Sequence, residues 1–177
     1  MTPEEHVFLE RARVASLATV DDAGRPHAVP ICFAFLERSA SPESAAANGS
    51  VHENSGDGDH TRLVSAIDEK PKSTRELQRV RNIRSNPTVT LLVDRYREDW
   101  SRLAWVQVRG RARILEPDIA ANHPDASVRF DAVRALESKY DQYADHDLES
   151  RPLLSIRVGR TVSWGALGDE AATANEG

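Results

Sequence analysis

Two strand-like runs near the start of the sequence constrain the fold more than any other feature. Residues 14–20 (VASLATV) and 25–36 (RPHAVPICFAFL) are separated only by the loop DDAG, which ends in Gly24. A four-residue loop with a glycine suited to positive φ is typical of a β-hairpin. Pro26 and Pro30 carry no backbone N–H, so the second run is expected to be an edge strand or to be interrupted.

Later runs continue this antiparallel pattern. Residues 62–67 are expected to form a third strand, and the nearly continuous apolar run 88–93 is expected to form a central one. The runs 153–158 and 161–164 are expected to close the sheet as a pair of strands around Gly159.

Residues 103–115 alternate strictly, as a half-buried strand does. One face is apolar, whereas the other carries Trp105, Gln107 and three arginines. This polar face is expected either to be exposed to solvent or to line a pocket for a polar ring. Gly110 is expected to mark a β-bulge or a close approach of two backbones.

Three helices are expected outside these strands. Capping-box patterns, in which Ser or Thr precedes Glu by three residues, begin helices at Thr2 and Ser73. The first helix should end near Ala12 and the second at Asn86, because the residue before a proline disfavours the α conformation. A third helix is expected over 125–143. Its inner stripe should consist of Ala126, Phe130, Val133, Leu136 and Tyr140.

The resulting order of elements predicts a small antiparallel barrel with helices packed outside. A doubly wound sheet is not expected, because no strand–helix–strand unit repeats and no GxGxxG motif follows a strand. Residues 1–167 are expected to form one domain and 168–177 a flexible tail. Residues 39–61 contain four acids but no aromatic residue, lysine or arginine, and are expected to be a disordered insert.

Bulk properties exclude several classes of protein. The net charge of −5 argues against general nucleic-acid binding. No run of 18 apolar residues is present, so no membrane span is expected. The N-terminus lacks the features of a signal peptide, which predicts a cytoplasmic protein. The single cysteine, Cys32, excludes an internal disulfide and a cysteine-based zinc site, and no metal ligands are assigned.

Residues 70–86 carry six Lys or Arg against one acid, a local charge of +5. Lys70 and Lys72 immediately precede the helix expected to start at Ser73, and free N–H groups in a first helical turn favour an anion. The hypothesis is that this turn holds the phosphate of a flavin-like cofactor. The alternative is a basic helix that is merely solvated.

Three stretches carry a resemblance to a known family. VASLATVDDAGRPHAVPICF and AIDEKPKSTRELQRVRNIRSNPTVTLLVD are similar to the pyridoxamine 5'-phosphate oxidase-like superfamily. DRYREDWSRLAWVQVRGRARIL resembles its subgroup of probable F420-dependent enzymes. The resemblance implies a mainly β (α+β) protein: a six-stranded antiparallel split β-barrel with flanking helices, of the FMN-binding type. It also implies a homodimer with two cofactor sites at the interface.

The resemblance also implies a set of cofactor-binding residues. Three of them would hold the phosphate: Lys70, Lys72 and Ser73. The others would lie along the ring system, and Ala66 and Ile67 would contact it through their backbone. These residues are Val29, Pro30, Ile31, Ala66, Ile67, Trp105, Gln107 and Trp164. Arg75 and Arg79 would suit the more anionic tail of coenzyme F420.

The function that follows is an F420-dependent oxidoreductase acting on an unknown small molecule, with hydride chemistry supplied by the cofactor and no catalytic residue assigned. The first alternative is the same fold binding FMN. A second is a non-catalytic cofactor-binding protein. Vitamin B6 oxidation is not expected, because the C-terminal part lacks a motif like the substrate-phosphate clamp of the true oxidases.

Overall fold

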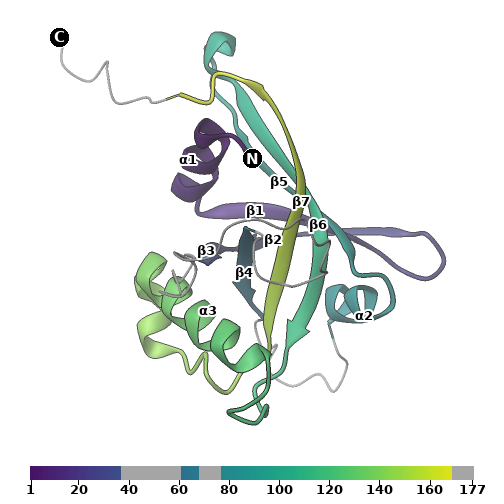
Figure 1. Ribbon diagram of the computed structural model, residues 1–177. Helices are drawn as coiled ribbons and strands as arrows, with labels where there is room; N and C mark the ends of the chain where they lie inside the picture. Colours follow the sequence, from purple (N-terminus) through teal and green to yellow (C-terminus); the bar gives the residue numbers. More distant parts are fainter. Residues whose placement is uncertain (37–60, 68–76, 169–177) are drawn as a thin grey trace, which may run out of the picture.

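The computed structural model describes residues 1–36, 61–67 and 77–168 (Figure 1). The expected insert at 39–61, apart from Thr61, lies outside the described residues, and so does the expected tail from residue 169 onward. The described residues form α1 (Pro3–Arg11), β1 (Val14–Val20), β2 (Pro26–Cys32), β3 (Ala34–Leu36), β4 (Arg62–Ala66), α2 (Gln78–Ser85), β5 (Thr88–Arg95), β6 (Ala104–Leu115), α3 (Asp125–Lys139) and β7 (Leu153–Gly165), with 3-10 turns at Trp100–Arg102 and Asp141–Asp145.

The strands form one seven-stranded antiparallel sheet in the order β2-β1-β5-β6-β7-β4-β3. Strands β2 and β3 occupy opposite edges of this sheet, yet only Phe33 separates them in sequence. The sheet must therefore curl until its edges approach each other (Figure 1). This confirms the mainly β, antiparallel split barrel. It also confirms that the proline-containing run would be an edge strand and interrupted.

The strand count is seven and not six, because the run 25–36 divides at Phe33. At this break the backbone of Phe33 forms hydrogen bonds with the side chain of Tyr140, at the end of α3. The Phe33 amide donates to the Tyr140 hydroxyl (3.0 Å), and that hydroxyl lies 2.7 Å from the carbonyl oxygens of Phe33 and Arg13. It has one hydrogen and donates to one carbonyl at a time. Tyr140 is only 3% exposed, and burial raises the pKa of its hydroxyl.

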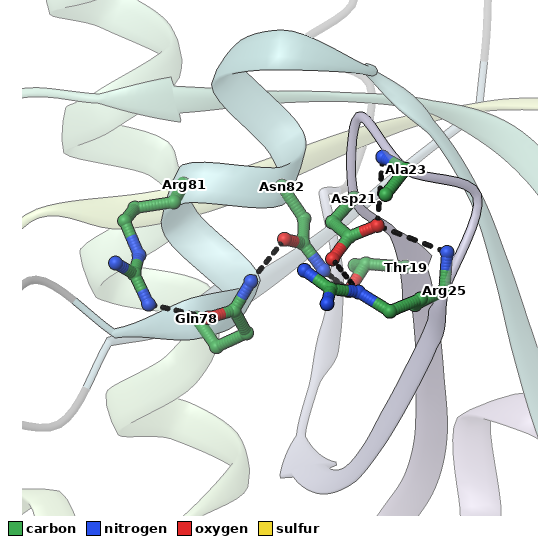
Figure 2. A network of polar contacts seen from close by, with 7 residues as sticks. All are labelled: Thr19, Asp21, Ala23, Arg25, Gln78, Arg81 and Asn82. Carbon is green, nitrogen blue, oxygen red and sulfur yellow. Dashed lines mark hydrogen bonds and ion pairs between the residues drawn. The ribbon is translucent and has the colours of Figure 1, made fainter.

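The hairpin turn between β1 and β2 forms as expected, with Gly24 at φ +77°. The carboxylate of Asp21 accepts hydrogen bonds from the amides of Ala23 (3.0 Å) and Arg25 (2.9 Å), and its other oxygen lies 2.8 Å from the Arg25 Nε (Figure 2). These bonds lower the pKa of Asp21, the bond from the Arg25 amide contributing most. A short polar loop of this kind fixes the register of the hairpin.

Helix α1 begins with the expected capping box. The Glu5 amide donates to Thr2 Oγ1 (3.2 Å), and the Thr2 amide donates to Glu5 Oε2 (2.8 Å). Glu5 is also buried and accepts a 2.7 Å hydrogen bond from Thr161 Oγ1 of β7. The cap therefore ties the helix to the sheet. Phe8 and Leu9 of α1 belong to the main core cluster.

Helix α3 corrects two expectations. It ends at Lys139 and not near residue 143, and Phe130, expected on the inner stripe, is 58% exposed. Arg129 takes the inner position instead. Its guanidinium donates to the carbonyl oxygens of Leu115 (3.1 Å) and Arg151 (2.8 Å), and also to those of Leu148 and Glu149. The buried carbonyl oxygens of residues 148–151, between α3 and β7, need hydrogen-bond donors, and a guanidinium supplies several.

Helix α2 begins at Gln78, not at a Ser73 cap. Leu77 occupies the N-cap position with an extended backbone (φ −59°, ψ 140°), so the helix does not continue back through it. Ser73 and its expected partner Glu76 lie outside the described residues. The expected end at Asn86 is confirmed.

Strand β7 is one strand of 13 residues, so the expected closing pair is wrong. Arg109 pairs with Arg160 but Gly110 pairs with Val158, which leaves Gly159 as the extra residue of a β-bulge. A Cβ on Gly110 would lie 2.4 Å from the Arg157 carbonyl oxygen. Both expectations for Gly110, a bulge and a close approach, are therefore confirmed. Among the described glycines only Gly24 and Gly165 have positive φ, so Gly159 does not form the tight turn that a closing pair of strands would need.

Two apolar clusters hold these elements together. One fills the barrel, and the other lies between α3 and the outside of β4, β6 and β7. Within the described segments, none of the helices combines the length and apolar character needed to cross a bilayer.

The break at Phe33 gives a first prediction. Replacing Tyr140 by Phe keeps the ring but leaves the buried Phe33 amide without its acceptor. We expect the free energy of unfolding to fall by about 1–3 kcal/mol, measured by urea denaturation. The control Tyr96→Phe alters a tyrosine that is 62% exposed and should leave it almost unchanged. Equal effects of the two substitutions would contradict this role for Tyr140.

Glu5 gives a prediction for pH dependence. Burial raises its pKa from the ordinary value of 4.5, but hydrogen bonds from Thr161, Thr2 and Ser163 together outweigh that effect and lower it. A carboxylate with a lowered folded pKa stabilises the fold above 4.5 and loses that contribution as pH falls through the lowered value. Wild type should exceed Glu5→Gln in unfolding free energy at about pH 7 and approach it near pH 3. A pH-independent difference would exclude this linkage.

Candidate cofactor-binding face

One row of directly opposed residues crosses five strands on the side of the sheet away from the barrel core. Its members, in spatial order, are Pro30, Ser16, Leu92, Gln107 and Val162. Their neighbours Leu17, Leu91 and Val108 are at most 1% exposed and point into the core. Successive residues of a strand point to opposite sides, so the row lies outside. We call the surface that contains this row the outer face.

Two tryptophans extend the outer face beyond this row. Trp105 of β6 lies directly opposite Trp164 of β7. Trp164 is 55% exposed, and Val14 and Leu92, at outer positions of β1 and β5, are 52% and 37% exposed. Exposed apolar side chains gathered on one sheet face are typical of a surface that binds a ligand or another protein.

Gln107 is a polar member of this row and lies two residues from Trp105 on the same face of β6. Its side-chain oxygen accepts a 2.9 Å hydrogen bond from Arg109 Nε. That bond holds the amide in one orientation and leaves its NH₂ group as a donor. An oriented donor beside aromatic side chains suits a flat heterocycle with carbonyl or ring-nitrogen acceptors.

The structure places the other expected ring-contacting residues differently. Ile31, Ala66 and Ile67 are buried, at 6–7% exposure, and Val29 packs half-buried against the core. The Ile67 amide already donates to the Pro152 carbonyl oxygen (3.3 Å). Any ligand contact by these residues would therefore involve their backbone, whereas Pro30 is exposed on the outer face.

Lys70, Lys72 and Ser73 lie outside the described residues, so their phosphate-binding role stays a prediction. The structure does describe the residues on either side, Ile67 at the end of β4 and Leu77 before α2. The chain leaves the sheet and returns to α2 at these two points.

A polar network holds the start of α2 against β1. Asn82 of α2 donates through Nδ2 to Thr19 Oγ1 (3.0 Å), and Gln78 donates to Asn82 Oδ1 (2.7 Å) (Figure 2). Thr19 Oγ1 donates in turn to the His27 carbonyl oxygen (3.3 Å), and Arg81 donates to Gln78. Asn82 and Thr19 are 2% and 1% exposed. Sequence reasoning missed this network, because nothing in the sequence distinguishes Asn82 from a surface asparagine.

Metal binding receives no support from side-chain geometry. No group of three His, Cys, Asp or Glu side chains within residues 1–36, 61–67 and 77–168 is arranged to hold an ion.

The sequence pattern of a known family matches nearly the whole described chain. That family is described as pyridoxamine 5'-phosphate oxidase, and the match covers residues 1–164. The chain belongs to this family. Membership confirms the superfamily resemblance and agrees with the split barrel. No curated protein sequence matches the chain.

Several solved structures share the fold. A conserved hypothetical protein from Mycobacterium tuberculosis is 21% identical, with a TM-score of 0.57, 93% of this chain covered and 85% of that chain. An FAD-binding protein from Mesorhizobium loti is 20% identical, with a TM-score of 0.54 and coverage of 92% and 94%. HutZ, the heme storage protein from Vibrio cholerae, is 14% identical, with a TM-score of 0.55 and coverage of 92% of both chains. At these identities the likeness shows the fold alone.

The α2 network gives a prediction. Asn82→Ala removes the donor to Thr19 and the acceptor of Gln78, both inside the protein. We expect the free energy of unfolding to fall by about 1–3 kcal/mol in urea titrations. Asn122→Ala, at an exposed position, is the matched control and should change it by less than about 0.5 kcal/mol. A silent Asn82→Ala would mean that the network does not hold α2.

Proposed function

We propose that this protein is an oxidoreductase that binds coenzyme F420 on the outer face, within a homodimer. The observation that supports this most directly is the pairing of Trp105 with Trp164 beside the oriented amide of Gln107. A flat ring system gains from aromatic contact and needs a few fixed polar partners. The family match independently favours a ring-bearing cofactor.

A second copy of the chain would complete the site. The outer face provides one wall, and its exposed Val14, Leu92 and Trp164 would otherwise remain in water. Two copies related by a two-fold axis would bury such apolar surface and create two equivalent sites between them. The proposal of a homodimer is therefore supported by the same exposed side chains as the cofactor proposal.

The cofactor phosphate would bind at the basic turn between β4 and α2. Lys70 and Lys72 supply positive charge and Ser73 a hydroxyl donor, the groups that bind phosphate most strongly. The Asn82 network holds the start of α2 against the β1–β2 hairpin, and α2 follows this basic segment in the chain.

The chain's own contribution would be binding and orientation. When bound, F420 supplies hydride transfer. Gln107 would orient the ring by donating from its amide, and the tryptophans would keep water from its faces. None of these side chains is required as a general acid or base, so we assign no catalytic residue.

FMN in the same position is the first alternative, and the likeness to an FAD-binding protein favours a flavin. The same ring contacts would serve either cofactor. A non-catalytic binding protein is the second alternative, favoured by the likeness to a heme storage protein. That alternative predicts cofactor binding without turnover of enones or quinones.

Cofactor titrations test the proposal. Purified protein is titrated separately with F420 and FMN while fluorescence quenching is followed. We expect F420 to bind, and both Lys72→Ala and Trp164→Ala to weaken binding by about 1–3 kcal/mol through loss of a charged contact or an aromatic contact. The controls Arg134→Ala and Phe130→Ala remove an exposed charge and an exposed aromatic ring from α3 and should have little effect.

Tight FMN binding without F420 binding would favour the first alternative and reject F420. Unchanged affinity in Lys72→Ala would place the phosphate elsewhere. Sedimentation equilibrium on the same samples tests the shared site, because a monomer that retains bound cofactor would contradict it.

A further inference from the structure

Four arginines gather on the outer face around the β-bulge. Arg109 of β6 lies directly opposite Arg160 of β7, and Arg111 lies directly opposite Arg157. We call these four residues the arginine quartet. They lie closer to α3 than the row that contains Gln107. Arg109, Arg111 and Arg160 are exposed, and Arg157 is half-buried.

The bulge is what brings the quartet to one face. Arg157 and Arg160 are three residues apart, and in a regular strand they would point to opposite sides. Gly159, the extra residue, resets the alternation, so both face the same side as Arg109 and Arg111. Bulges that re-aim side chains are enriched next to functional sites.

Like charges directly opposite each other on neighbouring strands destabilise a sheet, and the quartet contains two such pairs. No carboxylate in the described part of the chain pairs with Arg111, Arg157 or Arg160, and Arg109 bonds only to the neutral Gln107.

The neighbouring strand does not neutralise this charge either. Thr88 and Thr90 of β5 lie opposite Arg111 and Arg109. Hydroxyl groups can donate to an anion but carry no charge of their own. Positive charge is thus concentrated at one place on a chain whose net charge is −5.

We propose that the arginine quartet binds a small soluble ligand that carries two or more phosphate or carboxylate groups. Guanidinium groups bind such oxyanions in a bidentate manner. The two pairs lie roughly 7 Å apart along the strand, so one anionic group can contact each pair. A bound ligand would also remove the repulsion within each pair. The proposal concerns residues distinct from Lys70, Lys72 and Ser73 and does not depend on the proposed function.

Calorimetric titration with inorganic pyrophosphate tests the proposal on the full chain. We expect one binding site per chain. Arg111→Gln and Arg160→Gln, both at exposed positions where folding should not suffer, should each weaken pyrophosphate binding about tenfold or more. Arg134→Gln removes one charge from an exposed helical position and is the matched control, with affinity unchanged.

Thermal unfolding at low salt supplies a second readout. Without pyrophosphate, Arg160→Gln should unfold at a higher temperature than wild type, because the charge opposite Arg109 is gone. Pyrophosphate should raise the midpoint of wild type more than that of the variant. Three results would each overturn the proposal. Pyrophosphate could fail to bind, Arg134→Gln could lose as much pyrophosphate affinity as the quartet variants, or sodium chloride at matched ionic strength could raise the wild-type midpoint as much as pyrophosphate does. If a single-stranded oligonucleotide bound more tightly than pyrophosphate, the assignment to a small ligand would be overturned.

Discussion

The rest of the structure depends on how the edges of the sheet are brought together. Consecutive strands β2 and β3 lie at opposite ends of the sheet order, so the chain must pass from one edge to the other within a single residue, Phe33. The Tyr140 hydroxyl satisfies the backbone at that passage, from the end of α3. One buried side chain thereby links barrel closure to the packing of α3, and the outer face takes its curvature from that closure.

The outer face shows how one sheet can divide its surface between stability and binding. Near α3 it is covered by an apolar cluster that includes Val64 and Leu153. Along the same strands it then presents the arginine quartet, Gln107 and finally the tryptophans. Charged and apolar side chains are thus separated along the strands and not mixed. Such an arrangement can hold an anionic group and a flat ring at different places without either site disturbing the core.

Sequence reasoning located most strands because alternation and turn residues are local signals. It expected the proline-containing run to be an edge strand or interrupted but did not place a break at Phe33, since alternation continues unchanged through that residue. It placed Phe130 inside α3 on apolarity, although the carbonyls near Leu148 require Arg129 there. For the candidate site, register is the missing information. The sequence contains Trp105, Gln107 and Trp164, but only strand pairing shows that the tryptophans lie opposite each other.

The extra residue at Gly159 also bears on how this chain can change during evolution. With Gly159 lost, Arg157 and Arg160 would be two residues apart, as in a regular strand, and Ile156 and Val162 would keep their sides of the sheet. A deletion here would remove only the local bend and twist of the bulge, whereas a one-residue deletion elsewhere in β7 would need a new bulge or would turn part of the strand over. Chain length at this step should therefore vary more readily among related proteins than chain length in the rest of β7.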